Sequence, residues 1–159
     1  MLKIKIIAVG KLGERALSAL TGEYAKRLGR YCSLDIIEVM DESVSARDSE
    51  ALIIRRLSSE AGRVLERIRA DAYVVALDIK GESIDSVELS KKINALAGLY
   101  PEVAFVIGGS HGLHPDVLTR SDYILSLSRL TFPHQLARLI LLEQLYRSFK
   151  ILNNETYHK

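Results

Sequence analysis

The sequence of 159 residues has a single cysteine, no apolar run long enough to cross a bilayer, and very little net charge. Cys32 cannot form an intramolecular disulfide, and no set of histidine, cysteine or carboxylate residues has the spacing of a zinc site. The longest apolar runs, Tyr73–Leu77 and Val103–Ile107, fall far short of the roughly 20 residues of a membrane helix. We therefore expect neither a bound metal nor a membrane span.

Two further absences concern location and partner. The chain begins with the alternating strand pattern Leu2–Ile7 and lacks the apolar core and cleavage site of a secretory signal, which predicts a cytoplasmic protein. The formal net charge of +2 is smaller than the basic excess typical of nucleic-acid-binding proteins. Because lysine and arginine can still cluster locally, composition alone leaves the partner open.

What the sequence does contain is a regular alternation of two patterns. Apolar, β-branched runs that predict strands occur at Leu2–Val9, Leu34–Val39, Tyr73–Leu77, Val103–Ile107 and Tyr123–Leu127. Helical patterns lie between and after them, at Glu14–Leu28, Ser49–Arg69, Ser86–Leu96, a short turn after Pro115, and Pro133–Leu152. This order predicts one α/β domain over residues 1–159, with a mainly parallel sheet flanked by helices.

Three loops that follow predicted strands are the best places for a ligand. In open parallel sheets, ligands bind beyond the carboxyl ends of the strands, where the strand order reverses. The loops are residues 78–81, 108–115 and 128–133. The polar stretch Asp41–Asp48 is instead expected to be a mobile surface loop, because it offers nothing to a core.

The first of two notable loops is rich in glycine. Gly108, Gly109 and Gly112 directly follow an apolar strand pattern and allow the backbone to approach a ligand closely, although a tight turn alone explains them equally well. The loop lacks the Gly-Lys-Ser/Thr ending of a P-loop and does not match the dinucleotide fingerprint. A triphosphate or dinucleotide ligand is therefore disfavoured.

The second loop precedes the last helix. Pro133 is suited to a helix start, because its missing N–H would have no partner there. Backbone groups held by this stiff turn would face a cavity formed by Leu127, Leu130 and Phe132, which suits a flat heteroaromatic ring such as adenine. The alternative is that the segment only begins the helix.

The last helix and the chain end carry candidate polar residues. Apolar side chains surround much of the helix, which predicts burial on more than one side and hence a homodimer. Glu143 and Arg147 are four residues apart, either as an ordinary surface ion pair or with Arg147 contacting a phosphate or base. Tyr157 and His158 could stack on a base and handle a proton, or belong to a passive terminus.

Taken together, these segments resemble the RlmH family of bacterial SPOUT methyltransferases over the whole chain. The most specific segments are Ile107–Gly109 with Gly112 and Leu113, Leu125–His134, Glu143–Arg147, and Tyr157 with His158. The resemblance implies a trefoil knot in the C-terminal half, a rare exception to unknotted chains. It also implies homodimers that bind S-adenosylmethionine in the knot and methylate N3 of a pseudouridine in 23S rRNA on the assembled ribosome.

The resemblance also assigns residues to roles. Expected cofactor contacts are Leu77, Gly108, Leu127, Ser128, Arg129, Leu130, Thr131 and Phe132. Expected catalytic or RNA-facing residues are Glu143, Arg147, Tyr157 and His158, with His134 as a weaker candidate. Because N3 must lose a proton before it attacks, His158 is our hypothetical base and Tyr157 its orienting partner.

Two other functions remain open at this point. One is a non-catalytic factor that binds or assembles ribosomes with the same fold. The other is an α/β enzyme that acts on a small metabolite.

Overall fold

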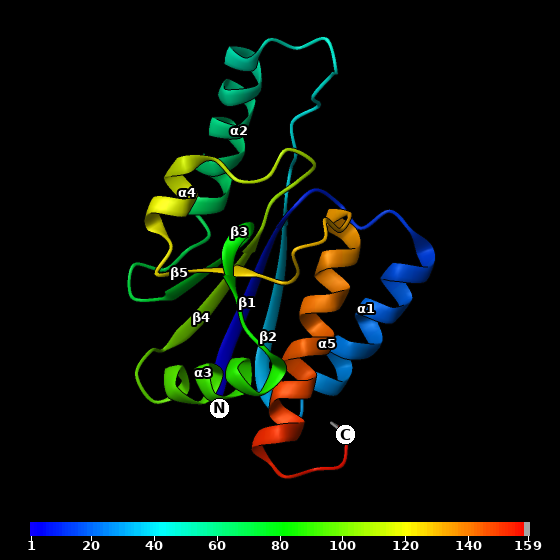
Figure 1. Ribbon diagram of the computed structural model, residues 1–159, viewed down its shortest axis with the longest axis vertical. Coiled ribbons are helices and arrows are strands. Elements are labelled where there is room, and N and C mark those ends of the chain that lie inside the picture. The colour runs from blue at the N-terminus through cyan, green and yellow to red at the C-terminus, as the bar shows by residue number, and fades with distance from the viewer. Residues whose placement is uncertain (158–159) are drawn as a thin grey trace.

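The computed structural model describes residues 1–157, in which five strands alternate with five helices (Figure 1). The strands are β1 (Leu2–Val9), β2 (Cys32–Val39), β3 (Tyr73–Ser83), β4 (Glu102–Ile107) and β5 (Tyr123–Ser126). The helices are α1 (Arg15–Leu28), α2 (Glu50–Leu65), α3 (Ser86–Ala97), α4 (Pro115–Arg120) and α5 (His134–Leu152). Within residues 1–157, no helix is both long and apolar enough to cross a membrane.

The strands form one sheet in the order β2-β1-β4-β3-β5, and every neighbouring pair is parallel. The predicted α/β class with a mainly parallel sheet is therefore confirmed. Because all strands point the same way, their carboxyl ends lie along a single edge. The loops that follow β4 and β5 consequently meet at that edge, beside the middle of β3.

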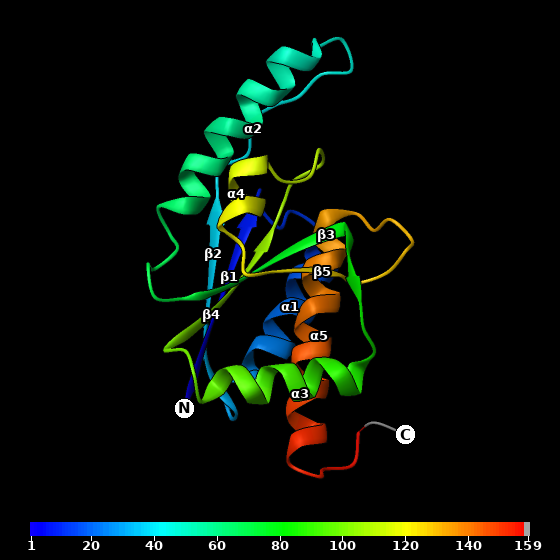
Figure 2. The ribbon, with the colours of Figure 1, turned by 60° about the vertical axis from the view of Figure 1, so that its left-hand side comes forward.

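Each face of the sheet has its own core. Alternate residues of β4 point to opposite sides, so that Val103, Phe105 and Ile107 join one apolar cluster while Ala104 and Val106 join the other. Helices α1, α3 and α5 cover the first cluster, and α2 and α4 cover the second (Figure 2). Burial on both faces explains why this strand reads as a continuous apolar run in the sequence.

Strand β3 is longer than the sequence predicts. Residues 78–81, expected to form a loop, continue the strand, and its register against β5 shifts between Leu77 and Glu82. Gly81 makes the extension possible, because a Cβ atom there would lie 2.7 Å from the backbone carbon of Ile124. An apolar-run pattern does not reveal an irregular continuation of this kind.

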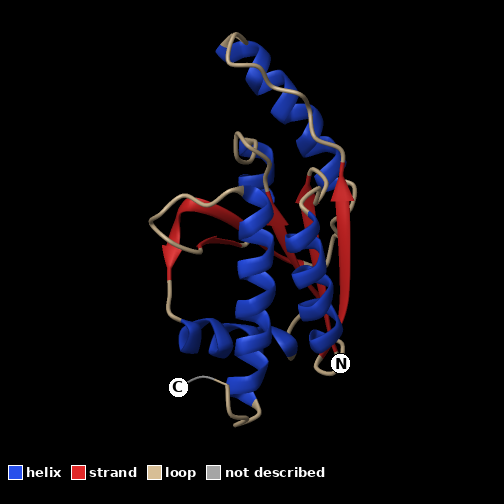
Figure 3. Ribbon diagram, turned by 90° about the vertical axis from the view of Figure 1, so that its right-hand side faces the viewer, coloured by secondary structure: helices blue, strands red, loops and turns tan. Residues whose placement is uncertain are grey.

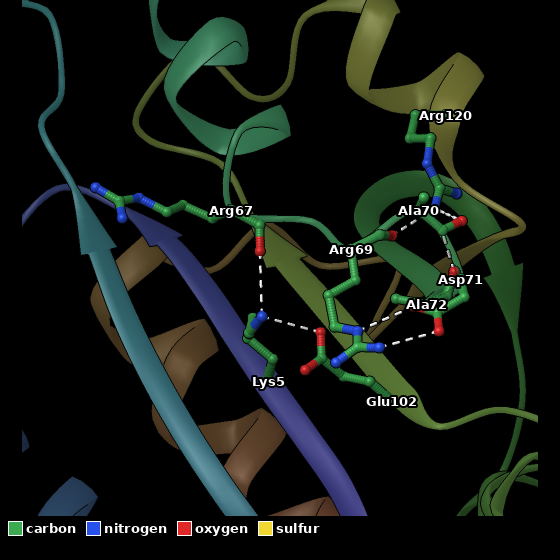
Figure 4. A network of polar contacts seen from close by, with 8 residues as sticks. All are labelled: Lys5, Arg67, Arg69, Ala70, Asp71, Ala72, Glu102 and Arg120. Carbon is green, nitrogen blue, oxygen red and sulfur yellow. Dashed lines mark hydrogen bonds and ion pairs between the residues drawn. The ribbon is translucent and has the colours of Figure 1, made fainter.

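Helix α2 ends at Leu65, before the predicted end at Arg69. In the turn that follows, the side chain of Arg120 binds three backbone carbonyls. Nη2 of Arg120 donates to the oxygens of Arg69, Ala70 and Ala72 at 3.2, 3.4 and 3.2 Å (Figure 4). Backbone carbonyls outside regular secondary structure need hydrogen-bond partners from elsewhere in the chain. Arg120 thus fixes the turn between α2 and β3.

A nearby ion pair anchors the same turn to the sheet. Nζ of Lys5, on β1, lies 3.0 Å from Oε1 of Glu102, at the start of β4. It also donates to the backbone oxygen of Arg67 at 3.2 Å (Figure 4). The two charged side chains are only 13 and 8 % exposed, so the pair is shielded from solvent.

At the other end of the sheet, a buried arginine ties α5 to the ends of β1 and β2. Arg138 is 2 % exposed, donates to the backbone oxygen of Gly10 at 3.0 Å, and pairs with the carboxylate of Glu38. Oε1 of Glu38 also accepts the N–H of Leu12 at 3.0 Å. These contacts hold the β1–α1 loop against the first turns of α5.

Replacing Arg120 by glutamine removes a donor shared by three carbonyls, and we expect the free energy of unfolding to fall by about 1–2 kcal/mol. Urea unfolding monitored by circular dichroism measures the change. Arg67→Gln is the matched control, because the Arg67 side chain points away from this network (Figure 4). Equal stabilities of the two variants would contradict the role given to Arg120.

The Glu38 carboxylate should make stability depend on pH. Burial alone would raise the pKa of Glu38, but the hydrogen bonds from Arg138 and Leu12 outweigh it and hold the pKa below the ordinary 4.5. The resulting stabilisation is present above pH 4.5 and is lost as the pH falls below that value.

We expect Glu38→Gln to lower the unfolding free energy at pH 7 by roughly 1.5–3 kcal/mol, because it leaves Arg138 without its charged partner. The gap between variant and parent should shrink between pH 5 and pH 3, as measured by urea unfolding. Asp35→Asn, on an exposed position of the same strand, should show no such convergence. A gap that stays constant with pH would refute this account.

Candidate functional site

A cavity of about 830 Å³ opens where β4 and β5 end, beside residues 77–79 in the middle of β3. Seven of the eight residues predicted to contact a cofactor line it, namely Leu77, Gly108, Leu127, Ser128, Leu130, Thr131 and Phe132. The eighth, Arg129, is exposed and is not one of the lining residues, so its cofactor role stays a prediction. The weaker candidate His134 also lines the cavity. The strand-end loops therefore form one concave site.

The glycine loop forms a wall of this cavity with its backbone. A Cβ atom on Gly108 would lie 2.6 Å from the backbone oxygen of Gly112, so only glycine fits there. Gly112 has a φ of +77° and donates its N–H to the oxygen of Gly109 at 3.1 Å. The loop is thus both a tight turn and a part of the cavity surface.

The loop between β5 and α5 is held by short-range hydrogen bonds. Ser126 donates from Oγ to the backbone oxygen of Ser128 at 2.9 Å, and Oγ of Ser128 accepts the N–H of Leu130 at 3.0 Å. Such side-chain turns fix a loop without help from a ligand. Leu130 remains 72 % exposed at the cavity, a large apolar side chain with no covering partner within the described residues.

The electrostatic character of the cavity is distinctive. Among the described residues that line it there is no lysine or arginine, and Asp78 is the only carboxylate. Sites for phosphate groups normally supply lysine or arginine side chains. The start of α5 lines this cavity at Pro133 and His134, but no such side chain accompanies it among the lining residues. This lining instead suits a ligand that carries positive charge and an apolar ring.

A second group of polar residues lies on α5. Oε1 of Glu143 accepts hydrogen bonds from Nε and Nη2 of Arg147, at 3.1 and 2.6 Å, and from the hydroxyl of Tyr157 at 3.1 Å. Its other oxygen accepts the amide of Gln144 at 2.6 Å. The structure therefore brings three of the four predicted catalytic residues together, while His158 lies outside the described residues.

Tyr24, on α1, joins this cluster and was not identified from the sequence. Its hydroxyl lies 3.3 Å from that of Tyr157, and because Tyr157 gives its proton to Glu143, Tyr24 must be the donor between them. Burial and the Glu143 carboxylate raise the pKa of Tyr157. Tyr157 is consequently a protonated donor at neutral pH. No sequence pattern connects residues 133 positions apart.

The cluster and the cavity lie on different sides of α5. Nine residues separate His134 from Glu143, which corresponds to two and a half helical turns, so the two side chains project in opposite directions. Ala137 is the last residue of α5 in the cavity lining, and Glu143 lies about 9 Å farther along the axis. Figure 3 shows α5 running away from the β5–α5 loop toward the chain end. Within residues 1–157 of a single chain, the cavity and the Glu143 cluster therefore lie apart.

No metal site is evident in residues 1–157, where no three histidine, cysteine or carboxylate side chains gather as a metal would require. His114 has a structural role, because its Nδ1 accepts the N–H of Asp116 at 3.2 Å and so caps α4. Nothing in the cavity or the cluster depends on His111.

Comparison with known proteins places these features in a family. A family model described as "Predicted SPOUT methyltransferase" matches residues 2–158. The "Ribosomal RNA large subunit methyltransferase H" of Clostridium kluyveri is 51 % identical over 162 residues, and that of Bifidobacterium adolescentis is 49 % identical over 160 residues. Each alignment covers 99 % of this chain and 100 % of the relative.

The fold comparison agrees with the sequence comparison. A probable methylase family protein of known structure from Haemophilus influenzae superimposes with a TM-score of 0.56, covering 100 % of this chain and 72 % of that one. At 19 % identity, this likeness supports the fold alone. The full-length relatives and the family model carry the assignment, and they confirm the resemblance inferred from the motifs: this chain belongs to the SPOUT methyltransferase family of enzymes.

Proposed function

We propose that this protein transfers a methyl group from S-adenosylmethionine to N3 of a pseudouridine in 23S rRNA, acting on the assembled ribosome in the cytoplasm. The observation that carries the proposal is an apolar cavity at the strand ends that contains a carboxylate and no cation among its lining residues. The names of the full-length relatives, as large-subunit rRNA methyltransferases, support an rRNA substrate. The proposal treats residues 1–159 as one domain with a trefoil knot in its C-terminal half.

The cavity fits the methyl donor in size and charge. S-adenosylmethionine is a nucleoside without phosphate and bears a positive sulfonium, and about 830 Å³ is within the range of small-molecule sites. Leu127, Leu130 and Phe132 would contact the adenine, and Asp78 would face the positively charged part. When bound, the donor supplies a methyl group on a good leaving group, so the protein need only hold the reactants in line.

The polar cluster would handle the nucleotide. Glu143 has its oxygens occupied by Arg147, Tyr157 and Gln144, so it orients these groups. Arg147 is suited to a phosphate or a base edge, and Tyr157 to a hydrogen bond with the uracil ring. His158 remains our candidate for the base that removes the N3 proton.

A homodimer would unite the cavity with the cluster. Leu136, Leu139 and Ile140 project from the same outward side of α5 as Glu143 and are only partly buried. Leu20, on the adjoining helix α1, is 49 % exposed. A second copy of the chain packed on this apolar face would cover it and bring its own cluster toward the cavity. The predicted homodimer would therefore be needed to assemble a complete site.

The proposal is tested by incubating ribosomes with protein and S-adenosylmethionine and analysing the rRNA by mass spectrometry. We expect one added methyl on a pseudouridine. In Gly109→Val the new side chain is directed at Val9, whose Cγ1 lies 3.4 Å from the added Cβ position, so the glycine loop that lines the cavity must shift. We expect donor affinity to fall by roughly 100-fold, or about 2.7 kcal/mol. Gly98→Val is the control, because nothing lies within 4 Å of its Cβ position.

Two outcomes would contradict the proposal. Failure to bind S-adenosylmethionine at millimolar concentration would favour a non-catalytic ribosome factor. Unchanged methylation of this pseudouridine in ribosomes from a strain lacking the protein would favour an enzyme acting on a small metabolite.

A further inference from the structure

Cations and aromatic rings gather at the ends of α1 and α5 that lie far from the cavity. These helix ends lie in the lower part of Figure 1. The cations are Lys26, Arg27, Arg30, Arg147 and Lys150. The guanidinium of Arg27 lies 5.4 Å from the ring of Tyr24 and 5.9 Å from that of Tyr146. We call this group of residues the α1–α5 basic surface.

This surface carries an excess of positive charge. Three of its cations are paired with carboxylates, Arg27 with Glu23, Arg147 with Glu143 and Lys150 with Glu155. Lys26 and Arg30 are exposed and form no ion pair with any residue of 1–157. The local excess therefore equals the formal net charge of +2 of the whole chain.

The two cations without ion pairs border a hollow. A cavity of about 440 Å³ is lined by Glu23, Lys26, Arg27, Arg30 and Tyr146. The ring of Tyr146 lies edge-on to that of Tyr157, with 5.0 Å between the ring centroids. The hollow is thus continuous with the cluster that we expect to handle the nucleotide.

We propose that the α1–α5 basic surface binds the phosphate backbone of the rRNA beside the nucleotide that is methylated, with Lys26 and Arg30 as its main phosphate contacts. This inference rests on the proposed function, because it takes RNA as the substrate. Phosphate contacts set the position of a nucleic acid without reading its sequence, and partly exposed tyrosine rings offer surfaces on which bases stack. A small local surface explains how a chain of low net charge engages RNA.

The test compares Lys26→Gln/Arg30→Gln with Lys91→Gln/Arg67→Gln, a control that removes one exposed lysine and one exposed arginine elsewhere. Binding to ribosomes is measured between 50 and 300 mM salt, and KM for ribosomes and affinity for S-adenosylmethionine are measured in parallel. We expect the first variant to bind ribosomes roughly tenfold more weakly and to lower the slope of log affinity against log salt by about 2. Its affinity for S-adenosylmethionine should match the control.

Lys26→Arg/Arg30→Lys should restore the salt slope, because it keeps both charges. Equal slopes for the glutamine variant and the control would overturn the inference. So would a change in the oligomeric state of the glutamine variant by light scattering, since the surface would then be a contact between protomers. If the parent protein binds ribosomes with the expected slope but transfers no methyl group, the proposed function fails while this surface stands.

Discussion

The parallel pairing of β4, β3 and β5 is the constraint on which the site depends. It brings the ends of β4 and β5 beside the middle of β3, so that segments distant in sequence form a single cavity. The apolar residues that bury these strands on both faces are therefore also what positions the site. Gly108 completes the arrangement, because any side chain there would collide with the backbone of Gly112.

Much of this edge could be predicted from sequence, because strand and turn signals there are local. The run Leu2–Val9 matches β1 without change, and Val103–Ile107 misses only the first residue of β4. Glycines directly after a buried strand, and a proline before a long apolar helix, are likewise readable from a few adjacent residues. Seven of the eight expected cofactor contacts consequently line one cavity.

What could not be predicted depends on partners far apart in the chain. The turn after α2 is held by Arg120, which lies about 50 residues beyond the carbonyls it binds, whereas Ile68 continues the helical apolar pattern past the end of the helix. Tyr24 meets Tyr157 only because α1 and α5 pack side by side. The irregular extension of β3 depends on close contact between Gly81 and β5. Local patterns carry no record of such contacts.

Helix α5 contributes residues to three different environments. The helix presents His134 and Ala137 to the cavity, buries Leu141, Leu142 and Leu145 in the core, and turns Glu143 outward. Because α5 is covered on several sides, little of its surface needs to be polar. This burial explains its apolar sequence, and neither a membrane nor a larger domain has to be invoked. Its outward side is where we expect a second chain to pack.

The central claim is that the cavity of one chain works with the Glu143 cluster of another, and a hybrid dimer tests it most directly. One chain carries Gly109→Val, which displaces the glycine loop of the cavity, and the other carries Arg147→Ala, which breaks the cluster. Differently tagged copies are co-expressed and the hybrid is purified. Each parent homodimer should be inactive, and the hybrid should recover about half of the wild-type activity, because one of its two sites is intact. A hybrid as inactive as its parents would contradict the account.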